Sequence, residues 1–372
     1  MKKDKVRVAH IMGKMVGGGV EAVVMNYYRN IDKTKVQFDF LVDEDSTDVP
    51  REEIESMGGR VIVIPPYQKL RDYLKKLQKV LKENQYTIVH SHINTLSVFP
   101  LYGAKKSGVE VRIAHSHSTT NKKEWKKDLM KNVLRPFSKR YATNYFACSC
   151  LAGRWLFGNK TYDQGEVHLI NNAIEVENFL YNEKIRLQKR KELSIQKDTL
   201  VIGHIGRFVK QKNHDFLLEI FNEIHKEEPN SILLLAGTGP LLEEIKKKTE
   251  ELNLENSVLF LGQRTDANEL YQAMDVFLLP SLYEGLPVVG VEAQASGLLC
   301  ILSTSMTKET KVLETTKFIS LQQTAKYWAE TILKEYANFT RTNTLKEIQK
   351  NGFDIKTEAK KLEKKYIELN KR

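Results

Sequence analysis

The chain has 372 residues, too many for one ordinary hydrophobic core and enough for two domains of about 150–200 residues each. Its apolar residues, 41% of the total, form no run of about 18, which excludes a membrane-spanning helix. Three cysteines are too few for a disulfide framework and favour a reducing, cytoplasmic compartment.

Residues 1–180 hold 29 basic and 20 acidic side chains, a net charge of +9 out of +11, which indicates an anionic ligand or surface. The charge comes without zinc-finger spacing or an aromatic RNP-like motif, so nucleic acid is not expected as a partner.

Strand and helix patterns alternate through residues 1–180, the first expected domain. A helix is expected near Leu70–Glu83, and the run NYFACSC, which holds Cys148 and Cys150, is expected as a buried strand. Short runs rich in Val and Ile predict the other strands: VRVAHIM, FDFLV, RVIVI, YTIVHSH and VRIAHSH. Such alternation predicts βαβ units and a parallel sheet.

The alternation restarts in residues 181–350, the second expected domain, after a charged stretch at 182–198 that contains no strand pattern. Helices are expected from about Asp215, over Leu241–Leu252, and over the GVEAQA segment. Strands are expected at TLVIGHIGR, SILLLAG, SVLFLG, VFLLPS and LCILS. The predicted fold class is therefore α/β, with two Rossmann-like, doubly wound parallel sheets, followed by a basic amphipathic helix within 351–372.

The segment PSLYEGLPVVGVEAQASG at 280–297 is the strongest functional signal. It follows a strand and opens a helix, and proline is suited to the first helical turn. The residues at this helix start are Gly285, Leu286 and Pro287. Free backbone N–H groups and the positive end of the helix dipole make such a start an anion site, suited to a diphosphate. Glu284 and Glu292 flank it, and their carboxylates can accept hydrogen bonds from vicinal sugar hydroxyls.

Two further loops follow predicted strands and contain residues suited to phosphate binding. In GHIGRFVKQKN the strand ends at Gly206, so Arg207 and Lys212 project at its carboxyl end, where ligands gather in open α/β sheets. These cations would neutralise a leaving nucleoside diphosphate, unless they are a solvated surface pair. A glycine run after the first strand allows close backbone approach to a ligand, or is a plain tight turn. It comprises Gly17, Gly18 and Gly19.

Two His-x-His pairs end successive strands of the first half, His90 with His92 and His115 with His117. Alternating residues of a strand point the same way, so each pair presents two imidazoles to one side. Such pairs can bind zinc, and a zinc hydrolase is one alternative function. The other interpretation is that these are polar strand-end residues with a structural role.

Taken together, these strings resemble the family-4 retaining glycosyltransferases of the GT-B fold. The resemblance runs from the glycine-rich first loop through VHSH, AHSHS, ACSCLAGRWLFG, VHLINNAIEVENF and GHIGRFVKQKN to LAGTGPLLEEIKKK, VLFLGQR and the Glu-x7-Glu segment. Within the family the chain is similar to the capsular and exopolysaccharide branch. The resemblance implies two Rossmann-like domains facing a central cleft, 1–180 for the acceptor and 181–350 for the donor, with 351–372 packing back on the first. The family's Asn-Gly-Ile-Asp hinge is Asn172-Ala173-Ile174-Glu175 here.

The resemblance also implies residue roles. Glu284 matches the glutamate on the donor-sugar hydroxyls, and Glu292 matches the one on the ribose. Arg207 and Lys212 match the basic pair on the diphosphate, and His117 matches the histidine beside the reacting sugar. The implied catalytic residues are His117, Glu284, Arg207 and Lys212, and His92 and His115 lie on the acceptor side. The implied donor-binding residues are Gly17, Gly18, Gly19, Gly206, Gly237, Gly239, Gln263, Arg264, Gly285, Leu286, Pro287 and Glu292.

The expected function is retaining transfer of a hexosyl or N-acetylhexosaminyl group from a UDP-sugar to a glycan or a polyprenyl-diphosphate-linked saccharide. The diphosphate leaves as the acceptor hydroxyl arrives on the same face, so the protein positions the reactants and stabilises developing charge. Arginine, lysine and a helix N-terminus replace a metal, so no divalent-metal cofactor is expected. Besides the zinc hydrolase, a nucleotide-sugar epimerase or hydrolase on the same fold and a non-catalytic GT-B partner subunit are the alternatives.

Residues 122–141 carry 8 basic and 2 acidic side chains and an apolar face of Trp125, Leu129, Val133 and Phe137. Pro136 is expected to kink or end this helix. One interpretation is a core helix with its lysines in water. The other is peripheral docking on an anionic inner membrane face, where each basic residue contributes about 1 kcal/mol.

Overall fold

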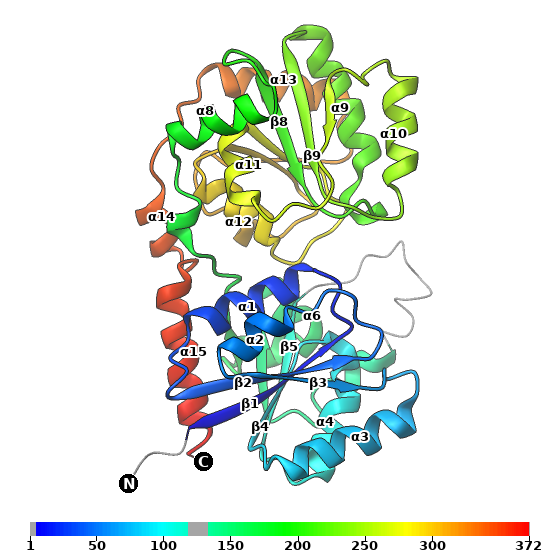
Figure 1. Ribbon diagram of the computed structural model, residues 1–372, viewed down its shortest axis with the longest axis vertical. Coiled ribbons are helices and arrows are strands. Elements are labelled where there is room, and N and C mark those ends of the chain that lie inside the picture. The colour runs from blue at the N-terminus through cyan, green and yellow to red at the C-terminus, as the bar shows by residue number, and fades with distance from the viewer. Residues whose placement is uncertain (1–4, 118–132, 372) are drawn as a thin grey trace. The chain divides into compact units, whose positions relative to one another are not determined.

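The computed structural model describes residues 5–117 and 133–371 and divides the chain into two compact units. Unit 1 comprises Met1–Ile174 and Asp354–Arg372, and unit 2 comprises Glu175–Phe353 (Figure 1). The division falls within the Asn172–Glu175 segment, and residues 354–372 belong to unit 1 although they follow unit 2 in sequence.

Unit 1 is built on a parallel sheet in the order β3-β2-β1-β4-β5-β6-β7. Its strands are β1 (Val6–Gly13), β2 (Val36–Asp43), β3 (Arg60–Ile64), β4 (Ile88–Ser91), β5 (Val111–Ser116), β6 (Asn144–Ala147) and β7 (Val167–Leu169). Its α-helices are α1 (Gly19–Asn30), α2 (Arg51–Ser56), α3 (Leu70–Glu83), α4 (Val98–Lys106), α6 (Cys150–Phe157), α7 (Asn159–Asp163) and α15 (Ile355–Leu369). The reversal of strand order between β1 and β4 is the doubly wound pattern, in which ligands bind at the carboxyl ends of the strands.

Helices cover both faces of this sheet. On one face, α3, α4 and α6 pack their apolar side chains on Ala9, Ile11 and Val89. On the other face, Tyr28 of α1 stacks on Phe38 of β2, and Tyr366 of α15 meets the same ring edge-on. Helix α15 contacts α1 and β2 (Figure 1). Its N-cap is Asp354, whose carboxylate accepts a hydrogen bond from the Thr357 N–H.

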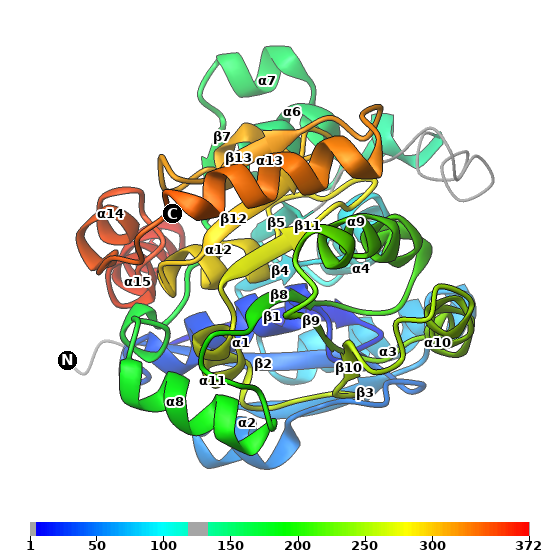
Figure 2. The ribbon, with the colours of Figure 1, turned by 90° about the horizontal axis from the view of Figure 1, so that it is seen from above.

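Unit 2 repeats the architecture with the order β10-β9-β8-β11-β12-β13, all parallel. Its strands are β8 (Leu200–Ile205), β9 (Ser231–Ala236), β10 (Val258–Phe260), β11 (Val276–Leu279), β12 (Leu299–Ser303) and β13 (Lys317–Ile319). Its α-helices are α8 (Glu183–Glu192), α9 (His214–Glu227), α10 (Leu242–Glu251), α11 (Ala267–Ala273), α12 (Val288–Ala295), α13 (Ala325–Ala337) and α14 (Leu345–Lys350). One core cluster joins the sheet to α9, α10 and α13, and a second joins its other face to α11 and α12 (Figure 2).

The predicted α/β class with two doubly wound parallel sheets is confirmed. The expected strand through Cys150 is wrong, because β6 ends at Ala147 and Ser149 instead accepts a hydrogen bond from the Ala152 N–H as the N-cap of α6. The sequence patterns also missed β7 and β13, edge strands of three residues each. Pro287 precedes the first residue of α12, Val288, rather than lying within the first turn.

Candidate functional site

In unit 2 the loops after β8 and β11 are fastened together at the carboxyl edge of the sheet. The Leu282 N–H donates to the Gln211 carbonyl at 2.8 Å, and the Asn213 amide donates to the Pro280 carbonyl at 3.1 Å. Asn213 has a positive φ of 58°, a conformation that asparagine tolerates better than most residues, and it ends the loop where α9 begins. This fastening fixes the backbone on both sides of the predicted phosphate-binding residues.

Lys212 and Glu284 meet across these loops. The Lys212 Nζ lies 2.7 Å from the Glu284 Oε1, and only 15% and 11% of the two side chains are exposed. A Cβ on Gly206 would come within 3.1 Å of the Lys212 stem, so the glycine leaves room for the lysine to lie over the strand end. An ion pair so little exposed is screened weakly by salt, and a phosphate or hydroxyl entering here finds both a donor and an acceptor already positioned.

Arg207 and the start of α12 lie at the same edge of the sheet. Gly206 separates Arg207 from the end of β8 at Ile205, and the Arg207 side chain is exposed, without an ion pair among residues 5–117 and 133–371. Gly285, Leu286 and Pro287 are buried and lead from β11 into α12. The combination of a helix N-terminus with cations on the neighbouring loop suits an anionic ligand.

Glu292 lies within α12 and its carboxylate accepts a hydrogen bond from the Tyr271 hydroxyl at 2.9 Å. Burial raises the pKa of Glu292 to about 7, and the hydrogen bond from Tyr271 lowers that pKa in part. A partly buried carboxylate poised near neutral pH can accept hydrogen bonds from a ligand's hydroxyls, but becomes a poorer acceptor when it takes up a proton.

The glycines after β9 are required by a close approach of two loops. A Cβ on Gly237 would lie 2.1 Å from the Gly206 carbonyl oxygen, and one on Gly239 would lie 2.5 Å from the Phe208 carbonyl oxygen. The Gly237 N–H also donates to the Gly262 carbonyl, which draws in the loop that continues to Gln263 and Arg264. Gln263 is exposed, whereas the Arg264 guanidinium is held by Asp266 at 2.6 Å and by Glu192 at 3.3 Å.

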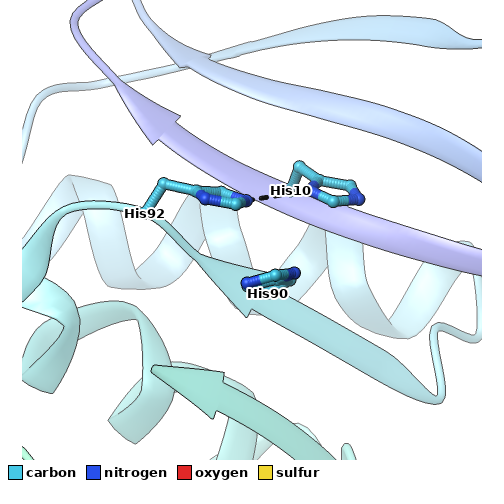
Figure 3. Close-up of side chains that lie close together, drawn as sticks. All are labelled: His10, His90 and His92. Atoms are coloured by element: carbon cyan, nitrogen blue, oxygen red, sulfur yellow. Dashed lines mark hydrogen bonds between the residues drawn. The ribbon is translucent and has the colours of Figure 1, made fainter. Parts of the chain in front are cut away.

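Unit 1 has a different assembly at its carboxyl edge, a buried cluster of five histidines: His10, His90, His92, His115 and His117. His10 Nδ1 lies 2.9 Å from His92 Nε2, and His92 Nδ1 lies 2.9 Å from His117 Nε2. Figure 3 shows the hydrogen bond between His10 of β1 and His92, which lies just beyond the end of β4, with His90 of β4 beside them. His90 Nε2 lies 3.0 Å from His115 Nδ1, and the other nitrogen of His90 is 2.6 Å from the Tyr366 hydroxyl.

Burial keeps these imidazoles uncharged. It lowers the pKa of His10 and of His117 to about 3, and together with the neighbouring rings it lowers the pKa of His90, His92 and His115 well below 6.5. A neutral imidazole has one N–H, so each contact pairs one donor with one acceptor, and the tautomer of His117 is coupled through His92 to that of His10. Two overlapping triads bring ring nitrogens within 4.8 Å, so the cluster also has the composition of a metal site.

The glycine-rich loop lies at the same edge of unit 1. Gly17 has a φ of 73°, Gly18 precedes the first helical residue of α1, and Gly19 is exposed. The Glu21 carboxylate folds back over the loop and accepts a hydrogen bond from the Val16 N–H at 3.1 Å. A Cβ on Gly18 would lie 2.7 Å from that carboxylate, so the packing of Glu21 is a structural reason for glycine at position 18.

The structure thus brings Lys212 together with Glu284 in unit 2, and His92 with His115 and His117 in unit 1. The sequence patterns missed His10, although it lies within β1 in register with His90 of β4, and alternation within VRVAHIM was a signal for it. They also missed Tyr271 as the partner of Glu292 and Asp43 at the end of β2.

Two family models match the chain, "Glycosyl transferases group 1" over residues 185–352 and "Glycosyltransferase Family 4" over residues 17–178. The protein named "Putative glycosyltransferase EpsF" of Bacillus subtilis (strain 168) is 40% identical over 91% of this chain and 89% of its own length. An Escherichia coli UDP-Gal:alpha-D-GlcNAc-diphosphoundecaprenol alpha-1,3-galactosyltransferase is 26% identical over 81% of this chain and 80% of its own. Anabaena HepE, crystallised with UDP and glucose, has the same fold, with a TM-score of 0.79 and 16% identity over 98% of this chain and all of that chain.

Proposed function

The chain belongs to the glycosyltransferases that these two family models describe, and from this premise we propose that it transfers a sugar from a UDP-sugar to a saccharide with retention of configuration. The observation that carries the proposal is the Lys212–Glu284 pair in unit 2, beside Arg207 and the start of α12. It offers cations for a diphosphate and a carboxylate for sugar hydroxyls at one edge of a sheet.

In the proposed reaction the β-phosphate leaves as the acceptor hydroxyl attacks the same face of the anomeric carbon. A phosphate oxygen takes the hydroxyl proton, so the protein needs no covalent nucleophile. Lys212 and Arg207 stabilise the negative charge that grows on the diphosphate, and Glu284 holds the sugar hydroxyls in place. His117 is proposed to lie beside the reacting sugar, and Glu292 to bind the ribose.

No divalent metal is part of this proposal, because two cationic side chains and a helix N-terminus supply the positive charge that a metal would otherwise provide. The loops at Gly17–Gly19, Gly237–Gly239 and Gln263–Arg264 are proposed to line the donor. Arg264 would reach a nucleobase only after leaving its ion pair with Asp266.

The acceptor proposed for this chain is a glycan or a saccharide linked to a polyprenyl diphosphate, in capsular or exopolysaccharide synthesis. Support comes from the E. coli relative, whose name specifies a diphosphoundecaprenol-linked acceptor. Within the described part of the chain, no helix is long and apolar enough to cross a membrane.

An inner-membrane docking face at 122–141 is the corresponding proposal for how the enzyme reaches such an acceptor. Most of this segment, including Trp125 and Leu129, lies outside the described residues. Val133 and Phe137 are 57% and 45% exposed, which supports an apolar face turned to the surroundings. The Pro136 region is a 3-10 turn over Arg135–Phe137. Docking predicts sedimentation with anionic but not neutral vesicles, reversed by high salt; equal binding to both would contradict it.

The function is tested by screening the purified chain against UDP-, GDP-, ADP- and dTDP-sugars. The expected result is that UDP and one or more UDP-sugars raise the melting temperature and that the UDP-sugar is slowly hydrolysed to UDP. Lys212→Ala should lose the protection, whereas Lys210→Ala, an exposed lysine in the same turn, should keep it. Release of an epimerised nucleotide sugar without acceptor would favour the epimerase alternative, and protection by no nucleotide would refute the donor assignment.

A further inference from the structure

Unit 1 contains a cavity of about 350 Å³ at the carboxyl ends of β1, β2 and β4. This volume is at the small end of the range for ligand pockets, about 300–1,000 Å³, and suits one or two sugar rings. Tyr67 lines it and stacks on Phe99 with parallel rings, giving an apolar aromatic wall. His92 and Asn94 also line it, and the Asn94 side chain accepts a hydrogen bond from the His117 N–H at 2.7 Å.

Two polar side chains in the cavity wall have no hydrogen-bond partner among residues 5–117 and 133–371. One is the buried Tyr73 hydroxyl. The Asp43 side chain is also buried, and none of the residues described donates a hydrogen bond to its carboxylate. Burial raises the pKa of Tyr73, and the nearby charge of Asp43 raises it further. Buried polar groups are nearly always paired in folded proteins, so the enclosed Tyr73 hydroxyl, beside an Asp43 carboxylate that no described residue pairs, points to a ligand in this cavity.

The charges around the cavity restrict the ligand further. Three carboxylates line it, those of Glu21, Asp43 and Asp45, against one cation, Lys14. Lys14 pairs with Asp45 at 2.8 Å. Glu21 accepts a hydrogen bond only from the neutral Val16 N–H, and Asp43 has no cationic partner among the described residues, so the cavity keeps a net negative charge. A carboxylate or phosphate entering this cavity would meet a like charge, whereas a hydroxyl-rich neutral ring would not.

We propose that this cavity is the acceptor subsite, and that it takes a neutral pyranose and excludes uronic acids and phosphorylated sugars. Asp43 accepts a hydrogen bond from a ring hydroxyl, and Tyr73 donates one to a ring or hydroxyl oxygen. The proposal rests on the glycosyltransferase function argued above and specifies its acceptor class. Any diphosphate on a lipid-linked acceptor must then lie outside the cavity.

The test is saturation-transfer NMR on the full chain at pH 7.5, with and without UDP, using pairs of methyl glycosides that differ only at C6. Methyl glucoside and methyl galactoside are compared with methyl glucuronide and methyl galacturonide. At least one neutral glycoside should give a signal, and its uronide should give one about tenfold weaker. Asp43→Asn should weaken the neutral signal about tenfold, as expected for loss of a hydrogen bond to a charged group, and should narrow the difference between the pair.

Tyr73→Phe tests whether misfolding explains a loss of binding, because the Tyr73 hydroxyl has no hydrogen-bond partner in the described part of the chain. It should keep the wild-type melting temperature and lose most of the glycoside signal. Asp48→Asn, an exposed carboxylate beyond the same strand, is the matched control and should change neither. UDP should raise the melting temperature of all three variants as it does that of the wild type. If UDP fails to stabilise the wild type, the donor assignment is wrong, and this result is distinct from a loss of glycoside binding. Equal binding of neutral and uronic glycosides, no neutral binding, or unchanged binding in both cavity variants would overturn the proposal.

Discussion

The first six strands of the unit 1 sheet and the six strands of the unit 2 sheet follow the same order, but the side chains at the carboxyl ends of the strands differ in charge. Unit 1 places five uncharged, mutually hydrogen-bonded imidazoles there, beside a cavity whose free charge is negative. Unit 2 places a lysine–glutamate pair there, beside an exposed arginine and a helix start. The order of the strands therefore fixes where a ligand can bind, whereas the residues at the strand ends decide which ligand it is.

The largest predicted difference between the units is in acid. A buried histidine with a lowered pKa binds fewer protons in the folded state than in the unfolded state, so the free energy of unfolding falls as pH falls below 6.5. Between pH 6.5 and 5 each such histidine costs about 2 kcal/mol. Unit 1 has five in its cluster, and unit 2 has two, His204 and His214, whose pKa values are also lowered by burial.

Raised carboxyl pKa values act in the opposite direction, and the described residues of each unit include one. The pKa of Asp43 is raised to about 6 and that of Glu292 to about 7, so each stabilises its own unit as pH falls through that value. Because each unit gains stability from one such carboxyl group, the two gains partly cancel when the acid stabilities of the units are compared. Pulse hydrogen exchange after incubation from pH 7.5 to 4 should therefore show unit 1 losing protection at a higher pH than unit 2. Simultaneous loss, or earlier loss in unit 2, would mean that the histidines are not held neutral.

The next largest effect concerns the cations of unit 2. Lys212→Ala and Arg207→Ala should each lower turnover about 10²–10³-fold, because each removes a donor that stabilises charge developing on the diphosphate. Steady-state transfer from the UDP-sugar measures this. Lys210→Ala, in the same turn, is the control and should stay within about twofold of wild type. Near-normal turnover in both variants would remove the phosphate site from this edge.

The two glutamates are expected to differ in which step they affect. Glu284→Gln should lower turnover about 10–100-fold with UDP affinity mostly retained, since it weakens hydrogen bonds to sugar hydroxyls. Glu292→Gln should instead weaken UDP binding about tenfold. In the wild type, UDP binding should strengthen as pH rises through about 7, because ionised Glu292 is the better acceptor. Calorimetry of UDP binding at pH 6 and 8 measures this dependence. Glu243→Gln, which changes an exposed glutamate, is the control. If Glu284→Gln weakened UDP binding and Glu292→Gln lowered turnover, the two proposed roles would be exchanged.

The smallest predicted effect is that of metal removal. Activity should survive chelation, and the purified chain should contain no stoichiometric zinc, because the cations of unit 2 supply the charge stabilisation. Elemental analysis measures the zinc content of the purified chain, and a transfer assay in the presence of a chelator measures the remaining activity. One equivalent of zinc that disappears in His92→Ala would instead assign the histidine cluster as a metal site and restore the hydrolase alternative.

Much of the fold was predictable because its strands are short apolar runs with regular spacing. β8, β9 and β11 were placed within one or two residues, as were α9 and α10. Where a local hydrogen bond competes with the hydrophobic pattern, the pattern failed, as at Ser149, where N-capping ends the strand early. Edge strands of three residues carry too little periodicity to detect.

The candidate site was predictable where residues cluster in sequence. Glu284 and Glu292 share one segment, and Lys212 follows a strand in a glycine-marked loop. The pairing of Lys212 with Glu284 spans 72 residues and depends on two loops meeting, which no local pattern reports. The same is true of Tyr366 beside His90, which lies 276 residues away in sequence.

The position of α15 has a consequence for how the protein is made. Ile174 and Asp354 form a parallel bridge, and the Ile355 N–H donates to the Ile174 carbonyl at 3.0 Å, so unit 2 is inserted into unit 1 between two adjacent points. During translation, all of unit 2 emerges before Tyr366, which hydrogen-bonds to His90. A nascent chain arrested after residue 353 would therefore contain a complete unit 2 and an unfinished unit 1. We expect the second unit in sequence to be the first to reach its native state, with the histidine cluster closing last.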